Sequence, residues 1–209
     1  KKPKFWDYKK PNFIAYLLLP FSYIVHIYNY IVHIYNNENL RIALRGTGKK
    51  SFYGKIKTIC VGNIYVGGTG KTPLSIKILK IFKESKWKAC FIKKEYSNQL
   101  DEQKLLSSNG KLFCKKNRVT AADDAVFENF DLAIFDDGLQ DKSIKYDISI
   151  VCFNGKVGAG NGCLLPAGPL RESIKNLKKY DAVFLNGNSI NESDFEKKIQ
   201  KDFPHIKIF

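Results

Sequence analysis

A glycine-rich run that ends in Gly-Lys-Thr has the composition of a phosphate-binding loop. The glycines let backbone N–H groups turn onto phosphate oxygens, the lysine reaches the β- and γ-phosphates, and the threonine hydroxyl ligates Mg²⁺. A β-branched apolar run (residues 56–63) precedes the loop and a helical pattern (71–86) follows it, which is the context a P-loop requires. Tyr65 replaces the first glycine of the usual motif. The residues predicted to bind a nucleotide are Gly67, Gly68, Thr69, Gly70, Lys71 and Thr72.

Two adjacent carboxylates supply the second half of a magnesium site. Asp136 and Asp137 follow the apolar run Leu132–Phe135 in "FDLAIFDDGLQ". Parallel strands present their carboxyl ends to the ligand crevice, and carboxylates there hold Mg²⁺ directly or through water. An aspartate that ends a strand is often only a turn residue, but after a P-loop we favour the magnesium site, with Thr72, Asp136 and Asp137 as its protein residues.

Strand and helix patterns alternate along the rest of the chain. This alternation predicts an α/β fold of the P-loop NTPase type, with a parallel sheet and helices on both faces. Residues 97–118 are polar and loop-rich, and we expect a lid or small hairpin there. Further strands are predicted at Ala89–Lys93, Ile148–Phe153 and Ala182–Leu185, and helices near Ala121–Phe127, Ser173–Lys179 and Glu192–Asp202.

The most apolar segment lies near the amino end, at residues 12–36. Pro20, two histidines and Asn29 interrupt it, so it is a poor transmembrane span, and its Tyr and Phe residues favour the lipid–water boundary. We expect an interfacial helix, kinked or restarted at Pro20, and the alternative is a buried helix that packs on the main domain. The heptapeptide "YIVHIYN" occurs twice in it, so its histidines are copies of one another. The predicted division is a membrane-associated segment, 1–48, with 37–55 as a link, and a kinase-type domain, 49–209.

Charge and cysteine content narrow the partners. The chain has 209 residues and a net charge of +15, and its first 57 residues carry eleven Lys and Arg against two acids. A basic end suits an anionic partner, either a membrane surface or a nucleic acid. The five cysteines are odd in number and form no CxxC spacing, which favours buried reduced thiols.

Three stretches together resemble one family, the tetraacyldisaccharide 4′-kinases (lipid A 4′-kinases). They are "VGNIYVGGTGKTP", "FDDGLQ" and "GNGCLLPAGPLRE" (160–172), and "KPKFWD" near the start is also similar. The resemblance implies transfer of the γ-phosphate of ATP, with Mg²⁺, to the 4′-hydroxyl of a tetraacyl disaccharide 1-phosphate. It implies a P-loop domain with an N-terminal helix at the cytoplasmic face of the bacterial inner membrane, and we expect no nucleic-acid partner.

The resemblance also assigns roles to residues. Lys71 and Asp137 become catalytic, and Asp101 in "LDEQ" corresponds to the base that acts on the sugar hydroxyl. Without the family, Asp101 would be read as a solvated loop carboxylate. Arg171 and Glu172 would likewise be an exposed pair at a helix start. The residues that the resemblance assigns to the substrate are Asn161, Arg171 and Glu172.

The chain departs from the family pattern in three places. "KKEYS" (93–97) replaces "SRGYG", Asp141 replaces the His after "DDGxQ", and the chain stops at "HIKIF" before a further family His. These departures predict a truncated chain or an inactive member. The alternatives are therefore a nucleotide-binding pseudokinase and another membrane-associated P-loop ATPase or GTPase, although no guanine-specific NKxD is present. A nucleic-acid ATPase rests on the charge alone, and salt-sensitive binding to DNA would test it.

Overall fold

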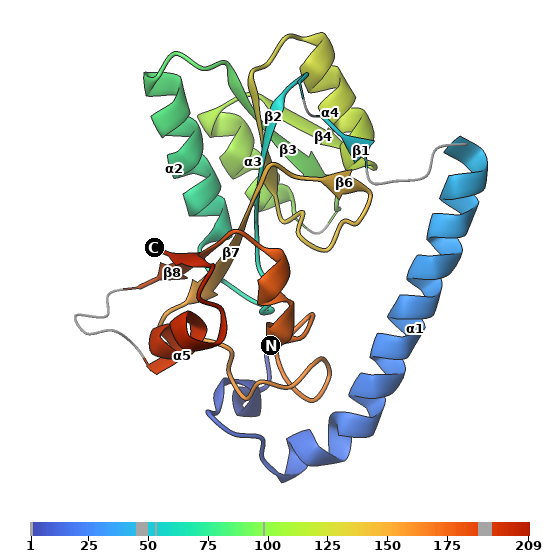
Figure 1. Cartoon of the computed structure of the whole chain (residues 1–209), viewed down its shortest axis with the longest axis vertical. Coiled ribbons are helices and arrows are strands. Elements are labelled where there is room, and N and C mark those ends of the chain that lie inside the picture. Colours follow the sequence, from blue (N-terminus) through green and yellow to red (C-terminus); the bar gives the residue numbers. More distant parts are fainter. Residues whose placement is uncertain (1, 45–49, 53, 98, 188–193) are drawn as a thin grey trace.

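The structure is a computed structural model that describes residues 2–44, 50–52, 54–97, 99–187 and 194–209. Its centre is a seven-stranded parallel sheet (Figure 1). A separate parallel pair joins β1 (Lys50–Ser51) to β6 (Ile144–Lys145). The strands of the main sheet are β2 (Lys57–Gly62), β3 (Ala89–Lys94), β4 (Leu112–Lys115), β5 (Leu132–Asp136), β7 (Ile148–Asn154), β8 (Ala182–Asn186) and β9 (Lys207–Ile208).

The strand order places the carboxyl end of β2 at a topological switch point. The order is β4-β3-β5-β2-β7-β8-β9, so the chain moves outward from β2 on one side, returns to β5 beside it, and then continues on the other side with β7. Val61 of β2 pairs with Asp136 of β5. Ligands of open α/β sheets bind at such a point, and here it brings the end of β2 next to the predicted acidic pair.

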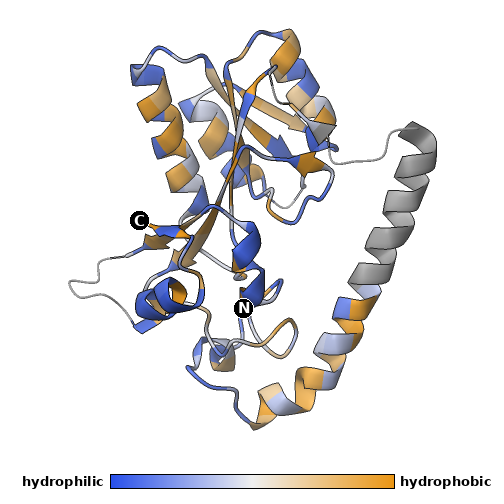
Figure 2. Cartoon of the chain, viewed as in Figure 1, coloured by the Kyte–Doolittle hydropathy of each residue, from blue (hydrophilic) through white to orange (hydrophobic). Residues whose placement is uncertain are grey.

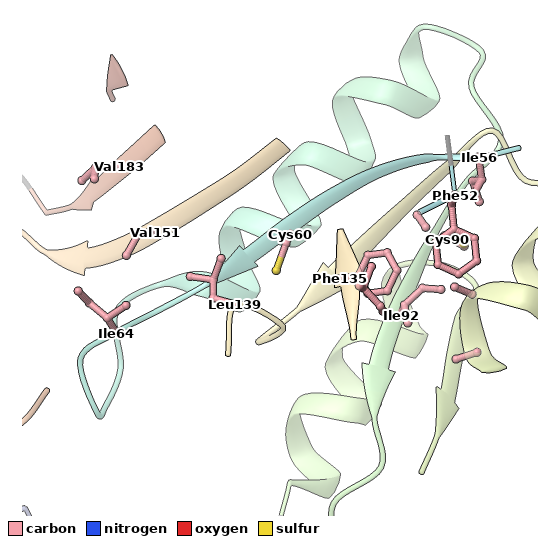
Figure 3. Packing of buried hydrophobic residues seen from close by; sticks show 14 of the residues in the cluster. Phe52, Ile56, Cys60, Ile64, Cys90, Ile92, Phe135, Leu139, Val151 and Val183 are labelled. Atoms are coloured by element: carbon pink, nitrogen blue, oxygen red, sulfur yellow. The ribbon is translucent and has the colours of Figure 1, made fainter. Parts of the chain in front are cut away.

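Helices cover both faces of the sheet, as predicted. Leu79 of α2 and Leu106 of α3 pack in one core cluster with alternate residues of β2, β3 and β5. Other residues of these strands, such as Cys60, Cys90 and Phe135, belong to a second cluster. That second cluster includes α4 alanines and Ile199 of α5, and Figure 3 shows part of it. The helix bounds are α2 (Lys71–Glu84), α3 (Leu100–Asn109), α4 (Arg118–Phe127) and α5 (Asp194–Asp202).

A long helix, α1 (Phe13–Leu44), extends away from the sheet (Figure 1). It is continuous through Pro20, so the helix does not restart there, and the alternative of a kink at Pro20 stays a prediction. Its first turns dock on the body: Ala15 and Ser22 are buried, and the Ser22 hydroxyl donates to the carbonyl of Leu164 (3.0 Å). No helix within the described residues is both long enough and apolar enough to cross a membrane.

Three element predictions need correction. Residues 97–118 are not a lid or hairpin, because they contain α3 and β4 and the start of α4. The segment 37–55 is not a plain link, because α1 continues to Leu44 and β1 lies at 50–51. The helix expected near Ser173–Lys179 is a 3-10 helix, η2 (Ile174–Lys179). Residues 192–193, the start of the last predicted helix, lie outside the described residues.

Candidate active site

The glycine-rich loop connects the carboxyl end of β2 to the first turn of α2, as the motif predicts. Gly70 is the N-cap of α2 and has a φ of 85°, and Gly67 has a φ of 131°. Both lie in the region that favours glycine. The loop therefore turns back onto the axis of α2, where free N–H groups and the helix dipole favour an anion.

The side chain of Asn63 stabilises this loop through two hydrogen bonds. Its Nδ2 donates to the Gly67 carbonyl (3.2 Å) and to the Thr69 hydroxyl (3.1 Å), and the Asn63 side chain is fully buried. The Asn63 Oδ1 atom is also buried and has no hydrogen-bond partner within the described part of the chain. The amide thus holds the loop in one conformation by two bonds on its nitrogen side.

The segment that carries the third motif braces the loop from the side. The Val66 N–H donates to the Pro169 carbonyl (2.8 Å), and the Arg171 N–H donates to the Ile64 carbonyl (2.7 Å). Tyr65, which replaces the first motif glycine, is buried, and its hydroxyl bonds with Asp7 and accepts from Lys2 (2.9 Å). The P-loop is therefore tied both to residues 169–171 and to the amino-terminal segment.

Two lysines and two carboxylates meet beside the loop. Lys71 Nζ lies 3.2 Å from Glu102 Oε1, and Lys93 Nζ lies 2.7 Å from both Glu102 Oε2 and Asp136 Oδ2. The side chains of Lys93 and Asp136 are fully buried, whereas Glu102 is 35% exposed. Ser75 donates to the other oxygen of Asp136 (3.2 Å). The cluster is formally neutral, and Glu102 bridges its two lysines.

The local electrostatics favour the charged forms of Lys93 and Glu102. Burial alone would lower the pKa of Lys93, but the charge and hydrogen bond of Asp136 and the contact with Glu102 raise that pKa overall. Burial would raise the pKa of Glu102, but the Lys93 hydrogen bond and the charge of Lys71 lower it overall. Glu102 is thus a carboxylate, and Lys93 is an ammonium, at neutral pH.

The second aspartate of the acidic pair also has a cationic partner. Asp137 has a φ of 59°, and its Oδ1 lies 3.1 Å from Nη1 of Arg171. The buried Arg118 donates to the Asp137 carbonyl (2.6 Å) and pairs with Asp141 (3.2 Å). Asp141, which departs from the family pattern, therefore serves as the counter-ion of a buried guanidinium.

The donor chemistry fits magnesium. Thr72 lies in the first turn of α2, and Asp136 and Asp137 lie at the carboxyl end of β5, so hydroxyl and carboxylate groups of the kind Mg²⁺ prefers lie at the same edge of the sheet. Both oxygens of Asp136 already accept protein hydrogen bonds. Thr72, Asp136 and Asp137 are the residues that would hold the ion.

The predicted base, Asp101, is exposed to solvent, whereas the predicted substrate residue Glu172 is held by hydrogen bonds within the protein. Asp101 is exposed in the first turn of α3, and the adjacent Glu102, not Asp101, contacts Lys71. Glu172 accepts from Gln140 (2.9 Å), Tyr180 (2.8 Å) and an asparagine, so its carboxylate is held by the protein.

Asn161 is buried and bonded within its own loop. Its amide donates to the Ala167 carbonyl (3.0 Å), and its Oδ1 accepts from the Cys163 N–H (3.1 Å). Its backbone N–H donates to the Trp6 carbonyl (3.0 Å). Among the three predicted substrate residues, Arg171 is the one whose side chain reaches the acidic pair.

Sequence reasoning did not identify Lys93, Glu102, Ser75 or Asn63. A lysine directly after the apolar letters "ACFI" was the available signal for Lys93, because a charge that continues a buried strand needs a partner. The described cavity of about 470 Å³ gives no such help, since it lies at the other end of β2 and α2 and is lined by residues including Lys57, Ser85 and Trp87.

Solved structures with a similar fold are known. A crystal structure of LpxK from Aquifex aeolicus in complex with ATP has a TM-score of 0.63 at 24% identity, over 82% of this chain and 58% of that one. The signal recognition particle 54 kDa protein from Aeropyrum pernix, in complex with GDP, has a TM-score of 0.52 at 9% identity, over 75% and 42%. Both similarities confirm the P-loop NTPase type of fold.

Sequence relatives specify the family. The tetraacyldisaccharide 4′-kinase of Pelagibacter ubique is 54% identical over 100% of this chain and 62% of its own length. That of Wigglesworthia glossinidia brevipalpis is 32% identical over 88% and 54%. The chain therefore spans about six tenths of the length of these relatives. The family model described as tetraacyldisaccharide-1-P 4′-kinase matches residues 14–209, and the chain belongs to that family.

Proposed function

We propose that this chain carries the ATP site of an enzyme that transfers the γ-phosphate of ATP to the 4′-hydroxyl of tetraacyldisaccharide 1-phosphate, in lipid A biosynthesis. The observation that supports it best is the convergence of Lys71, Thr72 and the Asp136–Asp137 pair at one edge of the sheet, in a member of this kinase family. Phosphoryl transfer needs mainly positioning and charge stabilisation, and this edge supplies both.

Each residue has a role in this proposal. The P-loop backbone and Lys71 bind the triphosphate. Thr72 and the aspartate pair would hold Mg²⁺, which would neutralise charge on the phosphates. Asp101, exposed on α3 beside Glu102, accepts the proton of the sugar hydroxyl. Arg171, at the rim beside Asp137, binds the anionic acceptor, and Asn161 and Glu172 keep its loop in shape.

The acceptor also explains the exposed face of α1. Large apolar side chains are exposed along residues 13–28 of this helix, a stretch that contains many hydrophobic residues (Figure 2). An acylated disaccharide resides in a membrane, and aromatic residues favour the interface. We propose that α1 lies on the cytoplasmic surface of the bacterial inner membrane, where ATP is available. The exposed side chains are Phe13, Ile14, Tyr16, Leu17, Phe21, Tyr23, Ile24, Val25, Ile27 and Tyr28.

A transfer assay tests the kinase. Radiolabelled ATP and tetraacyldisaccharide 1-phosphate in detergent micelles are incubated with this chain, with Lys71→Ala and with Lys77→Ala, an exposed lysine of the same helix. We expect Lys71→Ala to lower transfer by at least about a hundredfold and Lys77→Ala to leave it unchanged. The same assay on a chain extended to the relatives' length shows whether more of the protein is required.

The second candidate function is nucleotide binding without transfer. The observation in its favour is that Lys71 and both aspartates of the site are paired with protein charges. Bound ATP with no transfer by either length of chain would support this candidate and contradict the kinase.

Sedimentation with vesicles of phosphatidylethanolamine and phosphatidylglycerol tests the membrane contact. Leu17→Ser combined with Phe21→Ser should reduce binding about tenfold or more, because two large apolar side chains are lost from the contact. Ile81→Ser, at an exposed position of α2, is the control. Equal binding by all three proteins would contradict the assignment of α1 to the membrane.

A further inference from the structure

Lys93 is a buried cation that the proposed mechanism does not use. It is the residue after Ile92, which pairs with Phe135, so the ends of β3 and β5 place it opposite Asp136. Its side chain is fully buried, and its ammonium makes two 2.7 Å contacts with carboxylates from two different elements, β5 and α3. A lysine without exposure is rare unless it is paired on all sides.

Glu102 is the residue that this lysine shares with the P-loop. One Glu102 oxygen contacts Lys71 and the other contacts Lys93. A triphosphate on the loop needs the Lys71 ammonium, so Glu102 competes with the nucleotide for it. Lys93 offers Glu102 a second cation of equal charge at a shorter distance, 2.7 Å against 3.2 Å.

We propose that Lys93 is a positioning residue that retains Glu102, and with it the first turn of α3, when a nucleoside triphosphate draws Lys71 away. The inference rests on the proposed function, because Asp101, the proposed base, is the neighbour of Glu102 on that turn. Without Lys93, Lys71 is the remaining cationic partner of Glu102 within the cluster. Glu102 then competes with the phosphates of the nucleotide for the Lys71 ammonium. With Lys93 present, Lys71 can leave Glu102 for the phosphates, and both Glu102 and Asp136 keep Lys93 as their cationic partner.

Nucleotide affinity gives the main test. Dissociation constants for MgATP are measured by calorimetry for the wild type, Lys93→Met, Glu102→Gln and the double variant. We expect Lys93→Met to weaken binding about tenfold, the equivalent of one charge-assisted contact. Addition of Glu102→Gln should restore most of the lost affinity, because the competing carboxylate is gone. The loss that remains comes from Asp136, which keeps no lysine partner in either variant.

Lys94 provides the matched control. It is the next residue of β3, is only half-buried, and lies over the Tyr96 ring (5.6 Å) instead of in the cluster. Lys94→Met should bind MgATP as the wild type does. If Lys93 merely stabilises the fold, the double variant will bind as weakly as Lys93→Met, and the proposal is overturned.

Amide hydrogen exchange of the nucleotide-free protein gives a second test that needs no ligand. Exchange in the first turns of α3 should be faster in Lys93→Met and in Glu102→Gln, and unchanged in Lys94→Met. Because Glu102 is partly exposed, we expect Glu102→Gln to fold. This variant therefore tests the Glu102–Lys93 ion pair even if Lys93→Met does not fold. If the wild type binds no MgATP, the proposed function fails. If Glu102→Gln leaves hydrogen exchange in α3 unchanged, the proposed role of the Glu102–Lys93 ion pair in holding α3 is overturned.

Discussion

Glu102 is the carboxylate that joins Lys71 of the P-loop to the buried Lys93. Its pKa is lowered in the folded protein by Lys93 and Lys71, against the effect of burial. A group with a lowered pKa stabilises the fold above its ordinary pKa, here 4.5, and loses that contribution as the pH falls through its folded value. Lys93, whose pKa is raised by Asp136 and Glu102 against the effect of burial, stays protonated throughout this acidic range.

Substitution of Glu102 should therefore change the free energy of unfolding less at acidic pH than at neutral pH. We expect Glu102→Gln to lower the free energy of unfolding by up to about 1 kcal/mol near neutral pH, a small value because the group is partly exposed. The difference from wild type should shrink as the pH falls below 4.5. Urea denaturation across this range measures it, and a difference that is constant with pH would contradict the pairing.

The thiols form a second residue-scale prediction. All five cysteines are free, as the sequence predicts, and three are buried: Cys60, Cys90 and Cys152. Burial raises the pKa of Cys90 and Cys152 to about 12. A thiol reagent at neutral pH should therefore modify only Cys114 and Cys163 in the folded protein, and all five in denaturant. Rapid labelling of a buried cysteine, read by mass spectrometry, would contradict this packing.

At the scale of elements, sequence patterns predicted the strands and helices that carry a clear local signal, such as an apolar run or a glycine-rich loop. The apolar runs of β2 and β5 and the glycine loop before α2 are local signals, and the structure confirms them. The helix α3 was missed because "LDEQKLLSSN" buries only Leu106 and so shows almost no helical periodicity. The contact of Glu102 with Lys71 spans 31 residues, and no local pattern encodes such a pairing.

The loop–helix junction is sensitive to glycine conformation. Gly70 has a φ of 85°, and an added Cβ would lie 2.5 Å from Nδ2 of Asn186, whereas Gly68 has an ordinary φ and open space around it. Gly70→Ala should lower the free energy of unfolding by about 1–2 kcal/mol, and Gly68→Ala by much less. Urea denaturation of both variants measures the difference, and equal effects would exclude the observed loop conformation.

At the scale of the whole molecule, the amino-terminal segment, the third motif and the P-loop form one connected unit. The 3-10 helix η1 (Lys4–Asp7) lies against the 160s loop, where the Trp6 indole donates to the Pro166 carbonyl (3.1 Å). Gly160 has a φ of 59°, and a Cβ there would lie 2.2 Å from the Trp6 carbonyl oxygen. This close approach is a physical reason for the "GNG" of the third motif.

A pair of glycines isolates this contact. Gly160→Ala and Gly162→Ala carry similar backbone strain, since Gly162 has a φ of 75°, but a Cβ added at Gly162 would meet no atom within 4 Å. We expect Gly160→Ala to be the less stable by about 1–3 kcal/mol, with faster hydrogen exchange in η1. Thermal unfolding and exchange measure these effects, and identical behaviour would place η1 elsewhere.

The brace of Asn63 on the loop has a kinetic consequence. Its two bonds hold the phosphate cradle in shape before any ligand arrives, so the loop loses little conformational entropy at the moment of encounter. Capture of the phosphates should then be one fast, bimolecular event whose rate rises in proportion to nucleotide concentration. The transfer of Glu102 from two lysines to one is a separate, unimolecular event. Stopped-flow traces should therefore show a second phase whose rate reaches a plateau, and that plateau would be the rate at which the molecule changes partners.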